Sequence, residues 1–291
     1  MPTPLPDRAG RRCLAALNAL HSTIYFAPDL EKELSSYGIK DSMGAYLAGR
    51  AAALGEVAAG TVTACFYGFS HEMVARHLPA AWELVRPRTV LELRLGAADA
   101  VLRRYLGEDA IASREMAEAA ELALRACEAC TRPGHPMYAA LADQPVPQAP
   151  HLALWFAASL LREHRGDNHI AALVNAGIGG LESLVSHSAS SDGMPKELVM
   201  SKRGWTEADW RAAEERLRDR GLMDAAGALT AAGVRMREEL EAETDRLDAA
   251  PYEHLGAAHT ARLTELAGAF TTRAAVAGAF PAELLQIFAR G

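Results

Sequence analysis

Apolar residues recur at intervals of three and four along most of this chain, and the segments with that spacing stop at glycine or proline. The pattern starts at residues 12–26, before Pro28, and continues through 29–37, 42–53 and 59–67. This spacing is that of an amphipathic helix, and glycine and proline end helices. Alanine and leucine dominate the composition and aromatic residues make up only 6%, which also favours helices over sheets. We therefore predict an all-α, mainly helical fold.

The clearest boundary in the sequence is a proline-rich stretch at residues 131–150, which contains TRPGHP and QPVPQAP. Proline clusters of this kind mark linkers or rigid connecting loops. The 291 residues suffice for one large helical domain or two smaller ones, and we favour two. The predicted order is an N-terminal helical bundle at 1–130, the connector at 131–150, a helical, winged-helix-like domain at 151–255 and C-terminal helices at 256–291.

Bulk properties narrow the class of protein. The formal charge of −7 gives no general attraction to phosphate backbones, so nucleic-acid binding would need a local basic patch. Four cysteines are too few for a disulfide scaffold, and the pair Cys127 and Cys130 has no second pair or nearby histidine that would indicate a metal or redox site. No apolar run approaches about 20 residues and the N-terminus lacks the apolar core of a signal peptide. We expect a cytoplasmic protein without a cofactor and without membrane contact.

The segment around residues 206–247 has the order of elements of a winged helix. Thr206 is placed to cap a helix that Gly221 ends, and Thr230 is placed to cap the next helix. Between them, residues 222–224 and 228–230 are predicted to pair as a minimal β-hairpin. This order resembles the end of MarR-type winged-helix regulators. The resemblance covers about forty residues and implies a fold.

The charges of this segment are poor for DNA binding. Residues 206–220 carry five acidic side chains against four arginines, a net charge of −1, and the hairpin has Asp224 but no lysine or arginine. Phosphate contacts from basic side chains supply most of the non-specific affinity for DNA. We therefore interpret this degenerate winged helix as a structural or dimer-forming element, with DNA reading as the weaker alternative.

A dense polar cluster interrupts the apolar helix predicted at residues 151–174. Its titratable members are Arg162, Glu163, His164, Arg165, Asp167 and His169. Apolar residues lead into and out of the cluster, so part of it is expected to face the interior, where buried charges need partners. The simplest interpretation is a solvated face on which these charges satisfy one another. The functional interpretation is a pocket in which Arg162 or Arg165 holds an anion, Glu163 or Asp167 orients a histidine, and His164 or His169 exchanges a proton.

Further residues could line the same pocket. Trp155 lies two helical turns before Arg162 on the same stripe, and polar residues recur on the otherwise apolar helices of the N-terminal half. The N-terminal candidates for ligand binding are His21, Tyr25, Arg50 and Tyr67. His164 and His169 are five residues apart, which is about 140° around a helix and unsuitable for one metal, and the HExxH spacing is absent. We predict no metal site.

The stretches YLAGRAAALGEV, ACFYGF, LLREHRGDNHIAALVNAGIGGLESLV and RGWTEADW…RGLMDAAGALT…TDRL together resemble an actinobacterial helix-turn-helix family of SalK-like proteins. The resemblance covers most of residues 12–256 and implies that Arg162–His169 belongs to a family signature, but it implies no particular activity. Some members accompany natural-product genes. Ala53 stands where the family has proline, and Phe156 stands where it has histidine, which removes one polar group from the expected pocket.

These observations lead to three functional hypotheses. The first is a small-molecule-binding helical protein with an interhelical pocket, in its strongest form a cofactor-independent enzyme of specialised metabolism. The second is a ligand-responsive winged-helix transcription regulator. The third is a structural homodimer or scaffold.

Overall fold

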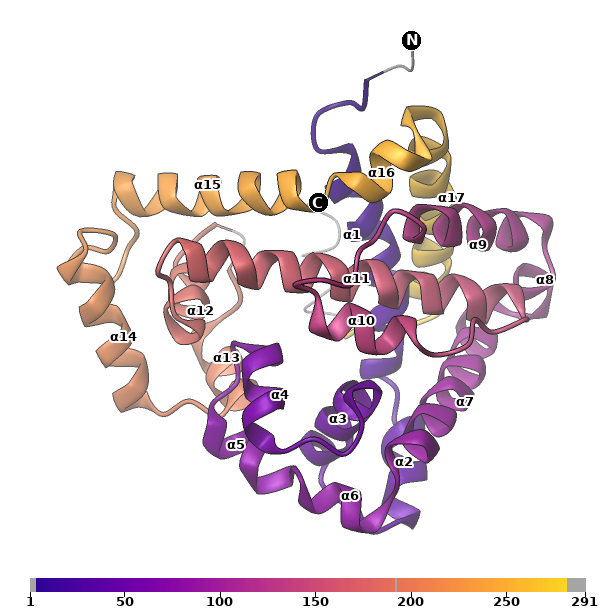
Figure 1. Ribbon diagram of the computed structural model, residues 1–291, viewed down its shortest axis with the longest axis horizontal. Coiled ribbons are helices and arrows are strands. Elements are labelled where there is room, and N and C mark those ends of the chain that lie inside the picture. Colours follow the sequence, from indigo (N-terminus) through magenta and orange to yellow (C-terminus); the bar gives the residue numbers. More distant parts are fainter. Residues whose placement is uncertain (1–3, 192, 282–291) are drawn as a thin grey trace.

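The computed structural model describes residues 4–191 and 193–281, and its regular elements are helices, so the prediction of a mainly helical chain is confirmed. Residues 282–291, the last part of the predicted C-terminal helices, lie outside the described residues. The longest helix, α11 (Pro150–Asn175), runs through the middle of the molecule (Figure 1). Within the described residues no helix is both long and apolar enough to cross a membrane.

A first group of helices packs around the N-terminal half of α11 and shares one hydrophobic core. Its members are α1 (Ala9–Ser22), α7 (Pro87–Leu106), α8 (Glu108–Ile111), α9 (Arg114–Cys127), α10 (Pro136–Ala142), α16 (Ala250–Leu255) and α17 (Ala257–Val276). The first and last helices, α1 and α17, lie against each other. The chain therefore closes this core with elements from both ends of the sequence.

A second core lies below this group in the view of Figure 1. It is built from α2 (Asp29–Ser36), α3 (Ser42–Ala51), α4 (Ala59–Phe66), α5 (His71–His77), α6 (Ala80–Leu84) and the first half of α7, with the short 3-10 turn η2 (Ala52–Leu54). Another 3-10 turn, η1 (Thr23–Tyr25), follows α1. These short helices bring α3 against α7.

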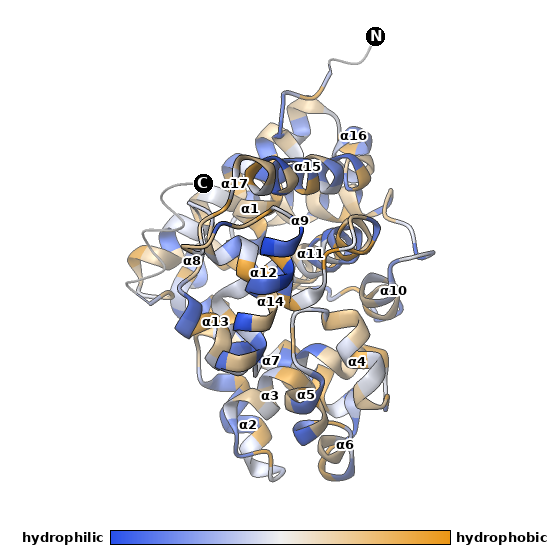
Figure 2. Ribbon diagram, turned by 90° about the vertical axis from the view of Figure 1, so that its left-hand side faces the viewer, coloured by the Kyte–Doolittle hydropathy of each residue, from blue (hydrophilic) through white to orange (hydrophobic). Residues whose placement is uncertain are grey.

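A third core surrounds the C-terminal end of α11. It comprises α12 (Gly180–Ser188), α13 (Lys196–Arg203), α14 (Glu207–Asp219) and α15 (Ala231–Leu247). Figure 1 shows α15 alongside α11, with α14 at the edge of the molecule. Hydrophilic and hydrophobic residues alternate along the helices in Figure 2, as expected for helices that bury one face.

The two helices of the expected winged helix begin where the sequence predicts. Thr206 caps α14 and shares a capping box with Asp209, and the Thr230 hydroxyl accepts a hydrogen bond from the amide of Gly233 at the start of α15. The predicted β-hairpin is wrong. The described residues contain no strand, and this segment holds only one isolated antiparallel bridge, between Met223 and Leu229.

The reason is the short length of the segment between α14 and α15. The Asp224 carboxylate accepts hydrogen bonds from the amides of Ala226 and Ala228, which folds the chain into a tight turn. Thr230, the last residue of the expected second strand, already caps α15. Too few residues remain to extend the bridge into a ladder.

Candidate functional site

Helix α11 continues without a break through Gly166, so the polar cluster is presented around one cylinder and its members face different neighbours. Glu163, His164 and Asp167 are buried, whereas Arg162, Arg165 and His169 are partly exposed. The structure therefore divides the predicted site residues among separate surroundings.

One part of the cluster lies against α3. The Arg50 guanidinium donates to both oxygens of the Glu163 carboxylate, at 2.8 and 3.2 Å, and the two side chains are only 12% and 8% exposed. Arg162 lies beside this pair and donates to the side chain of Asn18 on α1 at 2.6 Å. The Nε atoms of Arg50 and Arg162 are buried and have no hydrogen-bond partner. Burial opposes the ionisation of Glu163, but Arg50, Arg162 and Arg94 lower the pKa of its carboxyl below the usual value.

Two further arginines lie near this pair. The charge of Arg94 on α7 helps to lower the pKa of Glu163. The charge of Arg203, at the end of α13, helps Arg50 and Arg162 to lower the pKa of the Tyr46 phenol. We call the set Arg50, Arg94, Arg162 and Arg203 the arginine cluster. Among the described residues, Glu163 is the only carboxylate within ion-pair distance of any of them. The cluster therefore holds an excess of positive charge, and the part of it on Arg50 and Arg94 is largely shielded from water.

Aromatic rings support the guanidinium groups. Arg50 lies over Phe66 at 4.3 Å from the ring centre, and Arg203 lies over Phe69 at 4.1 Å. Although burial disfavours the phenolate, Arg50, Arg203 and Arg162 lower the pKa of Tyr46 to about 8. Tyr46 can therefore change its charge close to neutral pH, as an acid–base group must.

His21 and Tyr25 join the cluster through a defined chain of hydrogen bonds. The Ser159 hydroxyl donates to the carbonyl of Trp155, so its oxygen accepts the Nδ1 proton of His21 at 2.9 Å. The other ring nitrogen of His21 then accepts from the Tyr25 hydroxyl at 3.2 Å, and Arg94 donates to that hydroxyl at 3.3 Å. Burial and the neighbouring arginines hold the pKa of His21 well below its usual range, which keeps the imidazole neutral.

A cavity of about 380 Å³ opens between α1, α3, α11 and α15, and we call it the central cavity. Its lining includes the predicted residues Arg50, Arg162, Glu163, Arg165 and His169. Its volume lies within the range of small-ligand sites. The structure thus brings together five of the predicted residues around one hollow.

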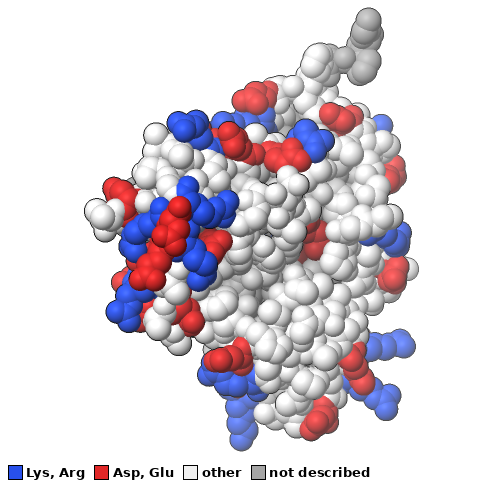
Figure 3. All heavy atoms as spheres, turned by 60° about the vertical axis from the view of Figure 1, so that its left-hand side comes forward, with Lys and Arg blue, Asp and Glu red and all other residues white. Residues whose placement is uncertain are grey.

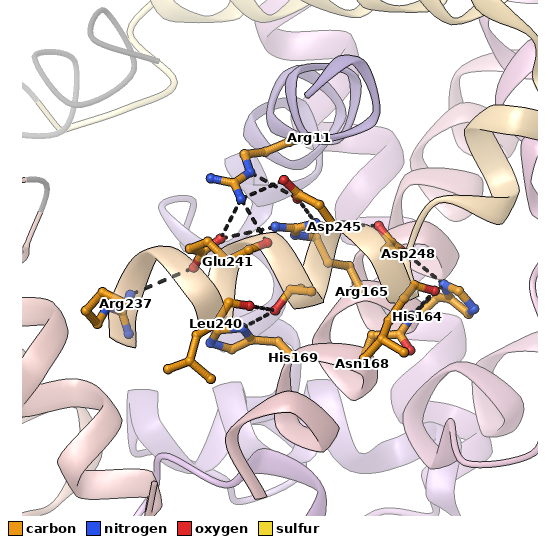
Figure 4. A network of polar contacts seen from close by, with 12 residues as sticks. Arg11, His164, Arg165, Asn168, His169, Arg237, Leu240, Glu241, Asp245 and Asp248 are labelled. Carbon is orange, nitrogen blue, oxygen red and sulfur yellow. Dashed lines mark hydrogen bonds and ion pairs between the residues drawn. The ribbon is translucent and has the colours of Figure 1, made fainter. Parts of the chain in front are cut away.

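The two ends of the central cavity differ in charge balance. At the α15 end, Arg165 and Arg11 share the carboxylates of Glu241 and Asp245, with the Arg165–Asp245 contact at 2.8 Å (Figure 4). These arginines are neutralised. At the α3 end, Arg162 has only Glu163, at 3.7 Å, which Arg50 already holds.

His169 faces the central cavity in a fixed protonation state. The Thr244 hydroxyl donates to the carbonyl of Leu240 at 2.7 Å, so it accepts the Nδ1 proton of His169 at 2.9 Å (Figure 4). Burial, which outweighs the attraction of Glu241, lowers the pKa of His169. The Nε2 atom therefore carries a lone pair at neutral pH.

The remaining predicted residues lie elsewhere. His164 is buried, contacts Asp248 through Nδ1 at 2.7 Å and stacks on His135. Asp167 accepts a hydrogen bond from the amide of Tyr138 in the first turn of α10, and Tyr67 donates to the carbonyl of Ile178. None of these three residues lines the central cavity.

Trp155 donates to the carbonyl of His21 and stacks on its ring, while its other side lines a different cavity near α7. No cluster of three or more histidine, cysteine or carboxylate side chains suited to a metal occurs in residues 4–191 and 193–281.

Sequence reasoning missed three residues of the site: Tyr46, Arg94 and Arg203. A signal existed for two of them. Tyr46 precedes Arg50 by one helical turn, and Arg94 follows the buried Val90 by one turn on the apolar stripe of α7. Arg203 gave no comparable signal, because it reaches the cluster only through the packing of α13 against the loop before α5, where the Arg203 carbonyl accepts from the amide of Ser70.

The segment α13–turn–α14 has the arrangement of a helix-turn-helix, but three arginines at the end of α14 are engaged within the protein. Arg216 pairs with Glu182, Arg218 pairs with Glu214, and Arg220 donates to two backbone carbonyls. Figure 3 shows the side that carries α14, where blue and red groups are interspersed without a continuous basic surface.

Comparison with known proteins gives one result. Residues 10–281 match the sequence profile of a family described as a helix-turn-helix family. No curated protein and no solved structure matches the chain. The match covers nearly the whole sequence and includes both the arginine cluster and the segment α13–turn–α14. The chain therefore belongs to this helix-turn-helix family.

Proposed function

We propose that the protein binds a small anionic molecule in the central cavity, at the end that Arg50 and Arg162 line. One observation carries the proposal: Arg50 and Arg162 both line this end of the cavity, and among the described residues Glu163 is the only carboxylate within ion-pair distance of either. Taking charge out of water is costly unless it is paired, so an uncompensated cluster is stabilised by an anion from outside.

Geometry favours Arg162 as the principal contact. Its side chain lines the cavity and is 27% exposed, and only one of its nitrogens has a hydrogen-bond partner, the Nη1 atom that donates to Asn18. A guanidinium presents its donors as a planar fork that matches a carboxylate or a phosphate. Arg165, the other candidate clamp, is held by Asp245 and Glu241.

The site also offers a proton acceptor, and a phenol lies close to it that titrates near neutral pH. His169 offers an unprotonated Nε2 to the cavity, and Tyr46 lies behind Arg50 with a pKa of about 8. A bound substrate could use these groups without a cofactor, as the enzyme form of the proposal requires.

Calorimetric titration with malonate and with inorganic phosphate tests the binding proposal. Arg162→Met should weaken the preferred anion by about tenfold or more, because it removes a charge-assisted contact. Arg211→Met, which changes an exposed arginine of α14 that contacts only a backbone carbonyl, is the matched control and should leave affinity unchanged. Equal binding by wild type and Arg162→Met, with both folded, would contradict the proposal.

A second candidate is a ligand-responsive regulator, which family membership and Arg203 favour. Arg203 is the last residue of α13, directly before the turn into α14, and its guanidinium acts on Tyr46 in the arginine cluster. An anion in the cluster would attract Arg203 and so favour one position of α13. Ligand and DNA affinities would then be linked reciprocally.

Mobility-shift assays with a fragment of the protein's own promoter test the regulator. Binding at near-physiological salt that changes on addition of the anion would support it. The regulator hypothesis would be contradicted if the protein gave no shift at that salt and bound at low salt without regard to the fragment's sequence. The homodimer stays a separate prediction, which light scattering tests.

A further inference from the structure

A second cavity shares no lining residue with the central cavity. It measures about 500 Å³ and lies between η2, α7, α11 and the loop that follows α10. We call it the connector cavity, since this loop belongs to the proline-rich stretch. Its walls are mainly apolar and include Leu91, Leu95, Leu141, Pro145, Trp155 and Phe156.

One buried charge reaches this cavity. Arg94 is only 5% exposed and lines the cavity from α7. Its guanidinium lies over the Trp155 ring at 4.8 Å and donates to the Tyr25 hydroxyl at 3.3 Å, and its Nε has no hydrogen-bond partner. None of the described carboxylates lies within ion-pair distance of Arg94. Glu92 and Arg88 also line the cavity, but both are largely exposed and pair with each other.

We infer that the connector cavity binds an organic monocarboxylate with an aromatic or branched apolar body. The carboxylate would pair with the unneutralised Arg94 fork, and the body would displace water from the apolar walls. The ion pair and the burial of apolar surface favour the same orientation of the ligand, with its carboxylate at Arg94 and its apolar body toward the proline-rich loop.

The cavity also selects against other anions. Arg94 is its only buried cation, and Arg88 on its exposed side is already paired with Glu92, so a dicarboxylate or a phosphate dianion would bring a second charge into the apolar interior without a partner. A neutral aromatic molecule would bury its body but would leave Arg94 unpaired. The connector cavity is thus expected to differ in ligand class from the central cavity, and the inference does not depend on the proposed function.

The experiment is a calorimetric titration of the full chain with β-naphthoate and with its neutral counterpart, β-naphthylmethanol. Wild type should bind the carboxylate at least about tenfold more tightly than the alcohol, because only the carboxylate pairs with Arg94. Arg94→Met should remove this difference. Saturating malonate should not displace the naphthoate, which separates this site from the central cavity.

Two variants guard against a folding defect. Leu91→Trp fills the cavity from its wall without changing Arg94 and should abolish binding of both probes. Arg103→Met makes the same chemical change on the same helix, at a residue that pairs with Asp99 and Glu108, and should leave naphthoate affinity intact. Equal affinity for the two probes in wild type, retained affinity in folded Leu91→Trp, or no naphthoate binding at millimolar concentration would each overturn the inference.

Discussion

At the scale of single residues, Tyr46 reports the charge state of the arginine cluster. Its phenol is partly buried, which alone would raise its pKa, yet the net effect of Arg50, Arg203 and Arg162 is a pKa of about 8. An ordinary tyrosine ionises near pH 10, so the shift is a measure of uncompensated positive charge. Any anion that enters the cluster should shift it back.

We predict that a phenolate absorbance component with a midpoint near pH 8 appears on titration of the folded protein and is missing in Tyr46→Phe. Because the folded pKa lies below the unfolded one, the phenolate favours the fold. Wild type should therefore gain stability over Tyr46→Phe as pH rises from about 8 to about 10, and that gain should vanish as pH falls. Spectrophotometric titration and urea unfolding measure the two effects. A midpoint near pH 10 in the wild type would contradict the prediction.

At the scale of elements, Asp167 links α11 to the start of α10. Its carboxylate accepts from the amide of Tyr138, whose helix otherwise begins without a side-chain cap. Burial, which the backbone hydrogen bonds only partly offset, raises the pKa of Asp167 to about 6. Ionised Asp167 therefore destabilises the fold through its buried charge, but its carboxylate supplies the hydrogen-bond acceptor at the start of α10.

We predict that Asp167→Asn is at least as stable as the wild type at neutral pH, since its amide oxygen keeps the acceptor without the buried charge. Asp167→Leu should lose about 1 kcal/mol, the usual cost of a missing cap. Because the folded pKa lies above the unfolded one, wild type should lose stability relative to Asp167→Asn as pH rises from about 4 to about 6. Urea unfolding at several pH values checks both. Loss of ligand binding in a stable Asp167→Asn would restore a site role.

The elements were largely predictable, because helix periods and the caps Thr206 and Thr230 are local signals. The absence of the β-hairpin was not predictable from local signals. Strands need paired partners, and the turn at Asp224 leaves too few residues for pairing. The sequence indicates the polar cluster of α11, but it does not indicate that the members of this cluster face different neighbouring helices. Arg50 lies 113 residues from Glu163 in sequence and Asp248 lies 84 residues from His164, so these pairings depend on tertiary packing.

At the scale of the whole molecule, a charged network ties α15, in the third group of helices, to α1 and α11. Asp245 on α15 accepts from Arg11 on α1 at 3.0 Å and from Arg165 on α11 at 2.8 Å (Figure 4). One carboxylate thus joins three helices that are far apart in sequence.

We predict that Asp245→Ala lowers the free energy of unfolding by about 2 kcal/mol, because it removes charge-assisted hydrogen bonds to two arginines. Hydrogen exchange, read by mass spectrometry, should accelerate across α15. Glu243→Ala, on the exposed face of the same helix with only Arg246 as partner, should change exchange little. If exchange accelerated only in the last turn of α15, Asp245 would not be holding the whole helix against α1 and α11.

Helix α11 has 26 residues, which makes it about 39 Å long at the usual rise per residue. Near its N-terminal end it lines the connector cavity with Trp155 and Phe156, further along it carries Arg162 and His169 into the central cavity, and its C-terminal end packs in the third core. A continuous helix of this length moves as one body, so a rotation or translation at one end also moves the other end. If a ligand in either cavity shifted α11, the shift would therefore reach α15, which packs along the same helix.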